Sequence, residues 1–115
     1  MEFGTALEQV KQGKAIAREG WNGKDQFVFM TPGRTLDLNV HDIWTPFVKA
    51  VAAANEGKVV IRSYLNIKTV DNQIQIGWVA SQSDMLADDW YVYYGIHKYM
   101  VKKGTIAEGD KGEAN

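Results

Sequence analysis

Turn-forming residues interrupt the apolar segments of this chain at short intervals. Asn22-Gly23, Pro32-Gly33 and Asp71-Asn72 each end a run of apolar or alternating residues, and such pairs favour a turn over continued helix or strand. The longest uninterrupted apolar run is Ala50–Ala54, which is far too short to span a membrane. The 115 residues must therefore fold through short strands and helices that share one modest core.

Several segments have the composition of β-strands: Ala15–Arg18, Gln26–Thr31, Lys58–Thr69, Gln73–Ile76 and Trp90–Tyr94. The first two flank Asn22-Gly23, so we predict a hairpin closed by a tight turn. The third segment is expected to bend near Ser63. The fourth alternates polar and apolar residues, as a half-buried antiparallel strand does.

Helical spacing appears at the N-terminus and in the middle of the chain. An apolar face predicts an N-terminal helix that Gly13 ends; its residues are Phe3, Ala6, Leu7 and Val10. Thr45-Pro46 predicts the start of a second helix, which Asn55-Glu56-Gly57 closes. Its expected apolar face consists of Phe47, Val48, Val51 and Ala52. A short helical turn is expected after Ser81 or Ser83, with Asp84 at its positive end.

These segments predict an α+β fold: a mostly antiparallel sheet of about five strands with an N-terminal helix and an inserted helix. We expect one ligand-binding domain over residues 1–103, with an insertion at about 32–63, and a mobile tail over 104–115. So few helices leave part of the sheet bare. Exposed aromatic residues at Tyr91, Tyr93 and Tyr94 would then favour self-association.

Composition excludes several classes of function. Thirteen Lys and Arg residues against fourteen Asp and Glu give a net charge of −1, which is too balanced for a protein that coats DNA, RNA or a membrane surface. The absence of cysteine excludes disulfides, thiolate metal sites and Cys nucleophiles. Charge and glycine interrupt the first twenty residues, so no secretory signal is expected and the cytoplasm is the default location.

The residues that could carry catalysis form no recognisable constellation. His41 and His97 have no partner at metal-ligand spacing, and no glycine-rich phosphate loop follows a strand. Ser83 lies beside Asp84, but no base with an orienting group accompanies it. Asp88-Asp89 is typical of a solvated helix end. We therefore expect no catalytic residues, no metal and no cofactor.

Tryptophan in turns is the strongest candidate for function. Trp21 precedes Asn22-Gly23 and Trp78 follows Gly77, and a turn tip usually points away from the core. Two indoles on a pocket rim could stack on a purine, and such stacking contributes about 1–3 kcal/mol of binding free energy per base. Arg18 and Lys24 bracket Trp21 and could pair with phosphates, while Ser81, Gln82 and Asp84 offer groups suited to ribose and a base edge. Alternatively, Trp78 packs on the sheet and Asp84 only caps a helix. Trp44 and Trp90 are expected in the core or an interface.

Two motifs in this chain resemble those of a small phage protein family. The first runs from Phe3-Gly4 through Ala17-Arg18-Glu19-Gly20-Trp21-Asn22-Gly23-Lys24, and the second is Gly77-Trp78-Val79-Ala80-Ser81-Gln82-Ser83-Asp84-Met85-Leu86-Ala87-Asp88-Asp89-Trp90. They are similar to the opening and the C-terminal signature of the Thoeris anti-defence protein 2 family of bacteriophages. The resemblance covers residues 1–31 and about 64–94, and leaves out 32–63 and the tail after Gly95.

That resemblance implies a sponge acting in the cytoplasm of the infected bacterium. Family members bind the glycocyclic ADP-ribose signal of Thoeris defence without degrading it, and some bind cyclic di- or trinucleotides of CBASS defence at separate sites. They assemble as homotetramers from two dimers, with pockets at subunit boundaries. The resemblance implies that Trp21 and Trp78 are stacking or wall residues and that Asn22, Ser81, Gln82 and Asp84 are hydrogen-bonding partners. Arg18 either contacts a phosphate or pairs with Asp84.

Other classes of function stay open from the residues alone. A hydrolase or lyase would destroy the same nucleotide signal, and an oligomeric phage structural or adaptor protein would use the aromatic residues for protein contacts.

Overall fold

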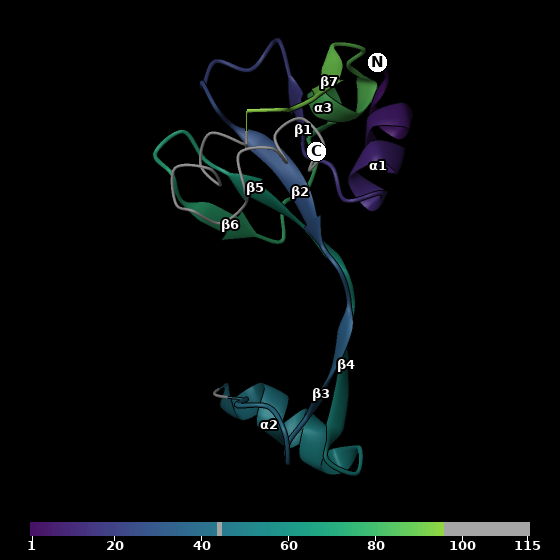
Figure 1. Ribbon diagram of the computed structural model, residues 1–115, viewed down its shortest axis with the longest axis vertical. Helices are drawn as coiled ribbons and strands as arrows, with labels where there is room; N and C mark the ends of the chain where they lie inside the picture. The colour runs from purple at the N-terminus through teal and green to yellow at the C-terminus, as the bar shows by residue number, and fades with distance from the viewer. Residues whose placement is uncertain (44, 96–115) are drawn as a thin grey trace, which may run out of the picture. The chain divides into compact units, whose positions relative to one another are not determined.

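The computed structural model describes residues 1–43 and 45–95, which form two compact units (Figure 1). Among the described residues, one unit contains residues 1–30 and 65–95, and the other contains residues 31–64. In the sequence, the second unit is therefore an insertion between the strands Phe27–Thr31 and Tyr64–Lys68, which are neighbours in the first unit's sheet. Trp44 and the predicted tail over 104–115 lie outside the described residues.

The first unit is built on a five-stranded antiparallel sheet, so the predicted α+β class is confirmed. Its spatial order is β6-β5-β2-β1-β7. Central β1 pairs antiparallel with β2 and β7, and β5 pairs antiparallel with β6. The strands are β1 (Ile16–Arg18), β2 (Phe27–Thr31), β5 (Tyr64–Lys68), β6 (Ile74–Ile76) and β7 (Trp90–Val92).

Helix α1 (Phe3–Lys11) packs its apolar face on this sheet as predicted. Ala6 and Val10 are completely buried, and Gly13 ends the helix with a left-handed φ of +91°. The sheet contributes Ile16, Val28, Ile67 and Trp90 to the same core cluster. Short α3 (Gln82–Leu86) lies between β6 and β7 in sequence and contacts α1.

The unit of residues 31–64 contains β3 (Arg34–Asp37), α2 (Pro46–Ala54) and β4 (Lys58–Ile61), with β3 and β4 paired antiparallel. The α2 boundaries agree with the predicted Thr45-Pro46 start, and Gly57 closes the helix at a φ of +86°. The predicted apolar face of α2 is only half right. Ala52 is buried, but Phe47 is 82% exposed and Val51 is 49% exposed.

The structure corrects two local predictions and adds one strand that was not expected. β1 and β2 do pair, but eight residues connect them rather than a tight Asn22-Gly23 turn, and the positive φ falls at Asp25. Gly23 is needed for space instead, because a Cβ there would run into the Val70 side chain. The expected strand over Lys58–Thr69 is two strands, β4 and β5, in different sheets, and the break between them falls at Ser63, where only a bend was expected. Strand β3 was not expected, since residues 34–44 lack a clean period.

Exposure also departs from expectation at the two sheet edges. All three residues of β6 are exposed rather than half-buried, because β6 is an edge strand. At the other edge Tyr91 and Tyr94 are exposed as expected, whereas Tyr93 is 7% exposed and packs on Phe27 with ring centroids 4.8 Å apart. Over residues 1–43 and 45–95, no helix combines the length and apolar character needed to cross a membrane.

Candidate functional site

Three tryptophans form one aromatic cluster in the first unit. The Trp21 ring meets Trp90 edge-on at 5.3 Å between centroids and Trp78 at 6.5 Å, and Trp78 meets Trp90 at 6.4 Å. Trp90 is 2% exposed, so it is a core residue, as expected. Trp21 and Trp78 are half-buried and pack against the core cluster. Part of each outer ring therefore remains accessible to a ligand.

Each half-buried ring comes from a connection that hydrogen bonds hold in place. Trp21 follows β1, and its backbone N–H donates to the Arg18 carbonyl at 3.3 Å. Trp78 follows Gly77, whose φ of +83° turns the chain out of β6. The N–H groups of Gly77 and Trp78 both donate to the Leu65 carbonyl at 2.9 Å. Glycine permits this turn because it adopts positive φ without a Cβ penalty.

Asp84 is the acceptor that joins the cluster to α3. Its Oδ1 accepts from Arg18 Nη1 at 2.8 Å and from the Trp21 indole Nε1–H at 3.1 Å. Its backbone N–H donates to Ser81 Oγ at 3.1 Å, and its Oδ2 accepts from the Ser81 backbone N–H at 3.3 Å. Ser81 is therefore the N-cap of a capping box. The backbone carbonyl of Asp84 also accepts from Trp90 Nε1–H at 2.8 Å.

Asp89 completes the network, and the sequence did not single it out as a site residue. Its Oδ1 accepts from Arg18 Nε at 2.8 Å, and its Oδ2 accepts from the Gly20 backbone N–H at 2.8 Å. A Cβ at Gly20 would lie only 2.7 Å from that Oδ2, so a larger residue there would displace the Asp89 carboxylate. The Asp88-Asp89 pair was interpreted as a solvated helix end. No local pattern in the sequence signals this contact, because Arg18 and Gly20 lie about seventy residues before Asp89.

The charges of this network stabilise one another. Burial tends to raise the pKa of Asp84, but the hydrogen bonds from Arg18, Trp21 and Ser81 outweigh burial, so that its pKa lies below the ordinary value. The Arg18 side-chain hydrogen bond is the main reason that the pKa of Asp89 is also lowered. The same two carboxylates raise the pKa of Arg18. All three groups are therefore charged at neutral pH.

The structure brings five of the seven expected site residues into one contact network: Arg18, Trp21, Trp78, Ser81 and Asp84. Of the two alternatives for Arg18, the structure has the pairing with Asp84. Asn22 and Gln82 are exposed and adjoin Trp21 and Ser81 in sequence. The described residues contain no group of three His, Asp or Glu side chains that could hold a metal ion. The arrangement offers aromatic surface beside exposed amide and hydroxyl groups, which suits binding of a polar ring compound.

Comparison with known proteins identifies the family of this chain. The Tad2-like family model, described as a Thoeris anti-defense 2-like domain, matches residues 1–93. A protein of Bacillus phage SP01 named Thoeris anti-defense 2 is 40% identical over 90 residues, which cover 78% of this chain and 91% of that protein. The matched range includes both tryptophan-bearing connections and the Arg18 network. The chain therefore belongs to the Tad2-like family, the family of Thoeris anti-defense 2-like domains.

Proposed function

We propose that this protein is a phage anti-Thoeris sponge, which binds a cyclic ADP-ribose-type signal in the host cell and holds it without cleavage. The observation that carries the proposal is the pair of half-buried indoles, Trp21 and Trp78, set edge-to-face at 6.5 Å beside the start of α3. Family membership supports an anti-Thoeris role. Glycocyclic ADP-ribose is the proposed ligand, and cyclic di- or trinucleotides belong to the screen as further candidates.

The chemistry of this ligand class matches the side chains at the site. A purine stacks on an indole face, and the exposed amides of Asn22 and Gln82 and the hydroxyl of Ser81 supply hydrogen bonds to ribose or base. Asp84 Oδ1 already accepts two hydrogen bonds, so its role in this proposal is to hold Trp21 in orientation. Arg18 likewise acts by pairing with Asp84 and Asp89 rather than as a free phosphate contact.

Sequestration works by mass action and needs no reaction. The dissociation constant must lie well below the signal concentration that activates the effector, and the binding sites must outnumber the signal molecules. A site that is already organised in the free protein loses little affinity to ordering. The hydrogen bonds that fix Trp21, Trp78 and α3 are consistent with such a site.

Analysis of ligand recovered from the complex tests the proposal against its enzymatic alternative. The protein is incubated with glycocyclic ADP-ribose, denatured by heat, and the released small molecule is identified by chromatography and mass spectrometry. We expect the ligand to raise the free energy of unfolding by RT ln(1 + [L]/Kd) and hence to raise the melting temperature. We also expect the ligand to be recovered intact and in full. Altered ligand identifies a hydrolase or lyase. Failure to bind any cyclic nucleotide, combined with capture of a phage protein, favours the adaptor alternative.

Truncation of either half-buried indole provides the mutational test. Trp21→Ala and Trp78→Ala should each weaken binding at least about tenfold, because a stack of about 1–3 kcal/mol is lost. Isothermal titration calorimetry gives the affinity, and circular dichroism checks the fold.

Phe47→Ala is the control, since it removes an 82% exposed aromatic ring from the other unit. Trp21→Phe adds a second comparison, because it keeps an aromatic face but loses the Nε1–H donated to Asp84. Equal affinities for wild type, Trp21→Ala and Trp78→Ala would contradict the assignment of both rings.

A further inference from the structure

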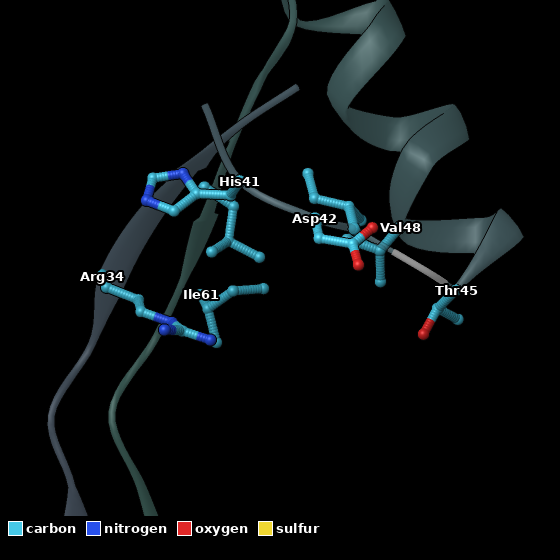
Figure 2. Close-up of a pocket in the computed structure, with 8 residues that line it drawn as sticks. Arg34, His41, Asp42, Thr45, Val48 and Ile61 are labelled. Atoms are coloured by element: carbon cyan, nitrogen blue, oxygen red, sulfur yellow. The ribbon is translucent and has the colours of Figure 1, made fainter. Parts of the chain in front are cut away.

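The unit of residues 31–64 contains a hollow of its own, shown in Figure 2. Its volume is about 410 Å³, which lies within the range of roughly 300–1,000 Å³ typical of small-molecule sites. The apolar wall comes from β3, β4, α2 and the segment before α2, through Leu36, Ile61, Val48 and Ile43. Ile43 is only 5% exposed, so this wall is part of the unit's small core. The hollow is separate from the tryptophan cluster, none of whose residues lines it.

Arg34 and His41 line one side of the hollow as seen in Figure 2, and both side chains carry hydrogen-bond donors. His41 Nδ1 accepts the Asp37 backbone N–H at 2.9 Å. In the neutral ring, the proton therefore resides on Nε2, which is left as a donor. Within residues 1–43 and 45–95, the Arg34 guanidinium takes part in no salt bridge. A guanidinium of this kind can bind a carboxylate or phosphate in bidentate fashion.

Acceptors lie across the hollow from these donors. Figure 2 shows Asp42 and Thr45 on the side away from Arg34 and His41. Thr45 is the N-cap residue of α2, and within the part of the chain that the structure describes its side chain makes no capping hydrogen bond. The Asp42 carboxylate would repel a simple anion, but it would attract an amino group at the far end of a longer ligand. The hollow therefore selects for a dipolar compound, because donors lie at one side, acceptors lie at the other and an apolar wall lies between them.

We propose that this hollow binds a small organic anion with a carboxylate or phosphate at one end, an apolar or aromatic body, and a hydrogen-bond-donating amino group at the other. The anionic end pairs with Arg34 and His41, the body packs against Leu36, Val48 and Ile61, and the amino group reaches Asp42. The proposal does not depend on the nucleotide-sequestering function of the tryptophan cluster.

Simple aromatic probes test this polarity on the full chain. 4-Aminobenzoate and 4-aminophenyl phosphate each carry an anionic group, an aromatic body and an amino group. The first tests the carboxylate and the second tests the phosphate. Benzoate lacks the amino group, aniline lacks the anion, and inorganic phosphate lacks the body. Nitrogen-15 NMR titration should show saturable shifts of the backbone amides of Arg34, Leu36 and His41 with at least one of the first two probes. The indole N–H signals of Trp21 and Trp78 should stay unchanged.

Substitutions in the same unit supply matched controls. Arg34→Gln should weaken probe binding about fivefold or more, since it removes a charge-assisted hydrogen bond. Arg62→Gln makes the same change at an exposed arginine that does not line the hollow, and it should leave affinity unchanged. Asp42→Asn should abolish the preference for 4-aminobenzoate over benzoate. Circular dichroism and the unperturbed amide signals of the other unit report that each variant is folded.

Three results would overturn the proposal. The first is the absence of saturable shifts at the lining residues up to about 10 mM of either complete probe, a concentration that corresponds to negligible affinity. The second is equal binding of inorganic phosphate, which would reduce the hollow to a general anion contact. The third is an equal effect of Arg34→Gln and Arg62→Gln.

Discussion

At the scale of single residues, Arg18 determines how the site is held together. Its guanidinium lies between Asp84 and Asp89, with N–O distances of 2.8 Å to each carboxylate. Asp84 lies in the first turn of α3, and Asp89 directly precedes β7. The arginine of β1 thereby joins two later segments to the connection that bears Trp21. A half-buried arginine with two acidic partners holds the attached segments in a fixed orientation. Movement of either segment would break an ion pair and leave a poorly solvated charge.

Asp84→Asn tests this network through its pH dependence. At neutral pH the variant should lose about 1–2 kcal/mol of unfolding free energy, because Arg18 and Trp21 lose a charged acceptor. The pKa of Asp84 in the folded protein lies below the ordinary 3.8. The carboxylate therefore stabilises the fold fully above about pH 4, and this contribution is lost as pH falls through the lowered pKa. Urea denaturation from pH 7 to strongly acidic pH should show the two proteins converging in stability.

Asp88→Asn is the matched control, since it neutralises an exposed acid outside the network. It should follow the wild-type curve across the range. A stability difference between Asp84→Asn and wild type that does not change with pH would argue against an ionic contribution from Asp84.

At the scale of elements, turn and cap residues were more informative than apolar periodicity. Gly13, Thr45-Pro46 and the Asp71-Asn72 turn marked the ends of elements correctly, because positive φ and a fixed proline φ are properties of single residues. The α2 face was only partly right because helical spacing gives no information about how much neighbouring surface is available to cover it. β3 was missed because its pairing with β4 supplies a stability that its own residues do not signal.

The candidate site shows the same difference between properties of single residues, which the sequence reveals, and long-range packing, which it does not. Turn position and motif resemblance pointed to Trp21, Trp78, Ser81 and Asp84. Asp89 was missed because its partners Arg18 and Gly20 lie about seventy residues away in sequence, and one sequence contains no signal for that contact. The half-burial of the two indoles also depends on their packing against Trp90, which only the three-dimensional arrangement provides.

Helix α3 offers a prediction at this scale, since the sequence left Ser81 and Ser83 as alternative caps. Ser81→Ala should lower the unfolding free energy by about 1 kcal/mol, because the capping box loses its side-chain acceptor. Ser83→Ala, the same change inside the same helix, should cost at most a few tenths of a kcal/mol. Chemical denaturation measures both values. Similar losses for the two variants would argue against the Ser81 cap.

At the scale of the whole molecule, the exposed edge of the sheet leads us to predict self-association. β6 is an edge strand whose Ile74 and Ile76 are 53% and 62% exposed, and an edge of this kind pairs readily with another chain. The family resemblance implies a dimer of dimers. Sedimentation equilibrium should therefore give the mass of four chains.

Ile76→Lys should shift that mass towards smaller species, because a charge on an edge strand opposes pairing. Val40→Lys introduces the same charge at a 75% exposed position in the other unit, and it should leave the assembly unchanged. A wild-type protein that sediments as a single chain would refute the expectation.

The neighbouring position of β2 and β5 makes the chain modular. The two strands lie side by side in the sheet, and the Asn66 side-chain amide donates to the Phe29 carbonyl at 3.4 Å. A two-residue Asn-Gly link from Met30 to Leu65 should therefore replace the whole 31–64 segment as a tight hairpin turn. Such an excision would leave a miniature that keeps the aromatic cluster and loses the hollow, so that each could be assayed without the other.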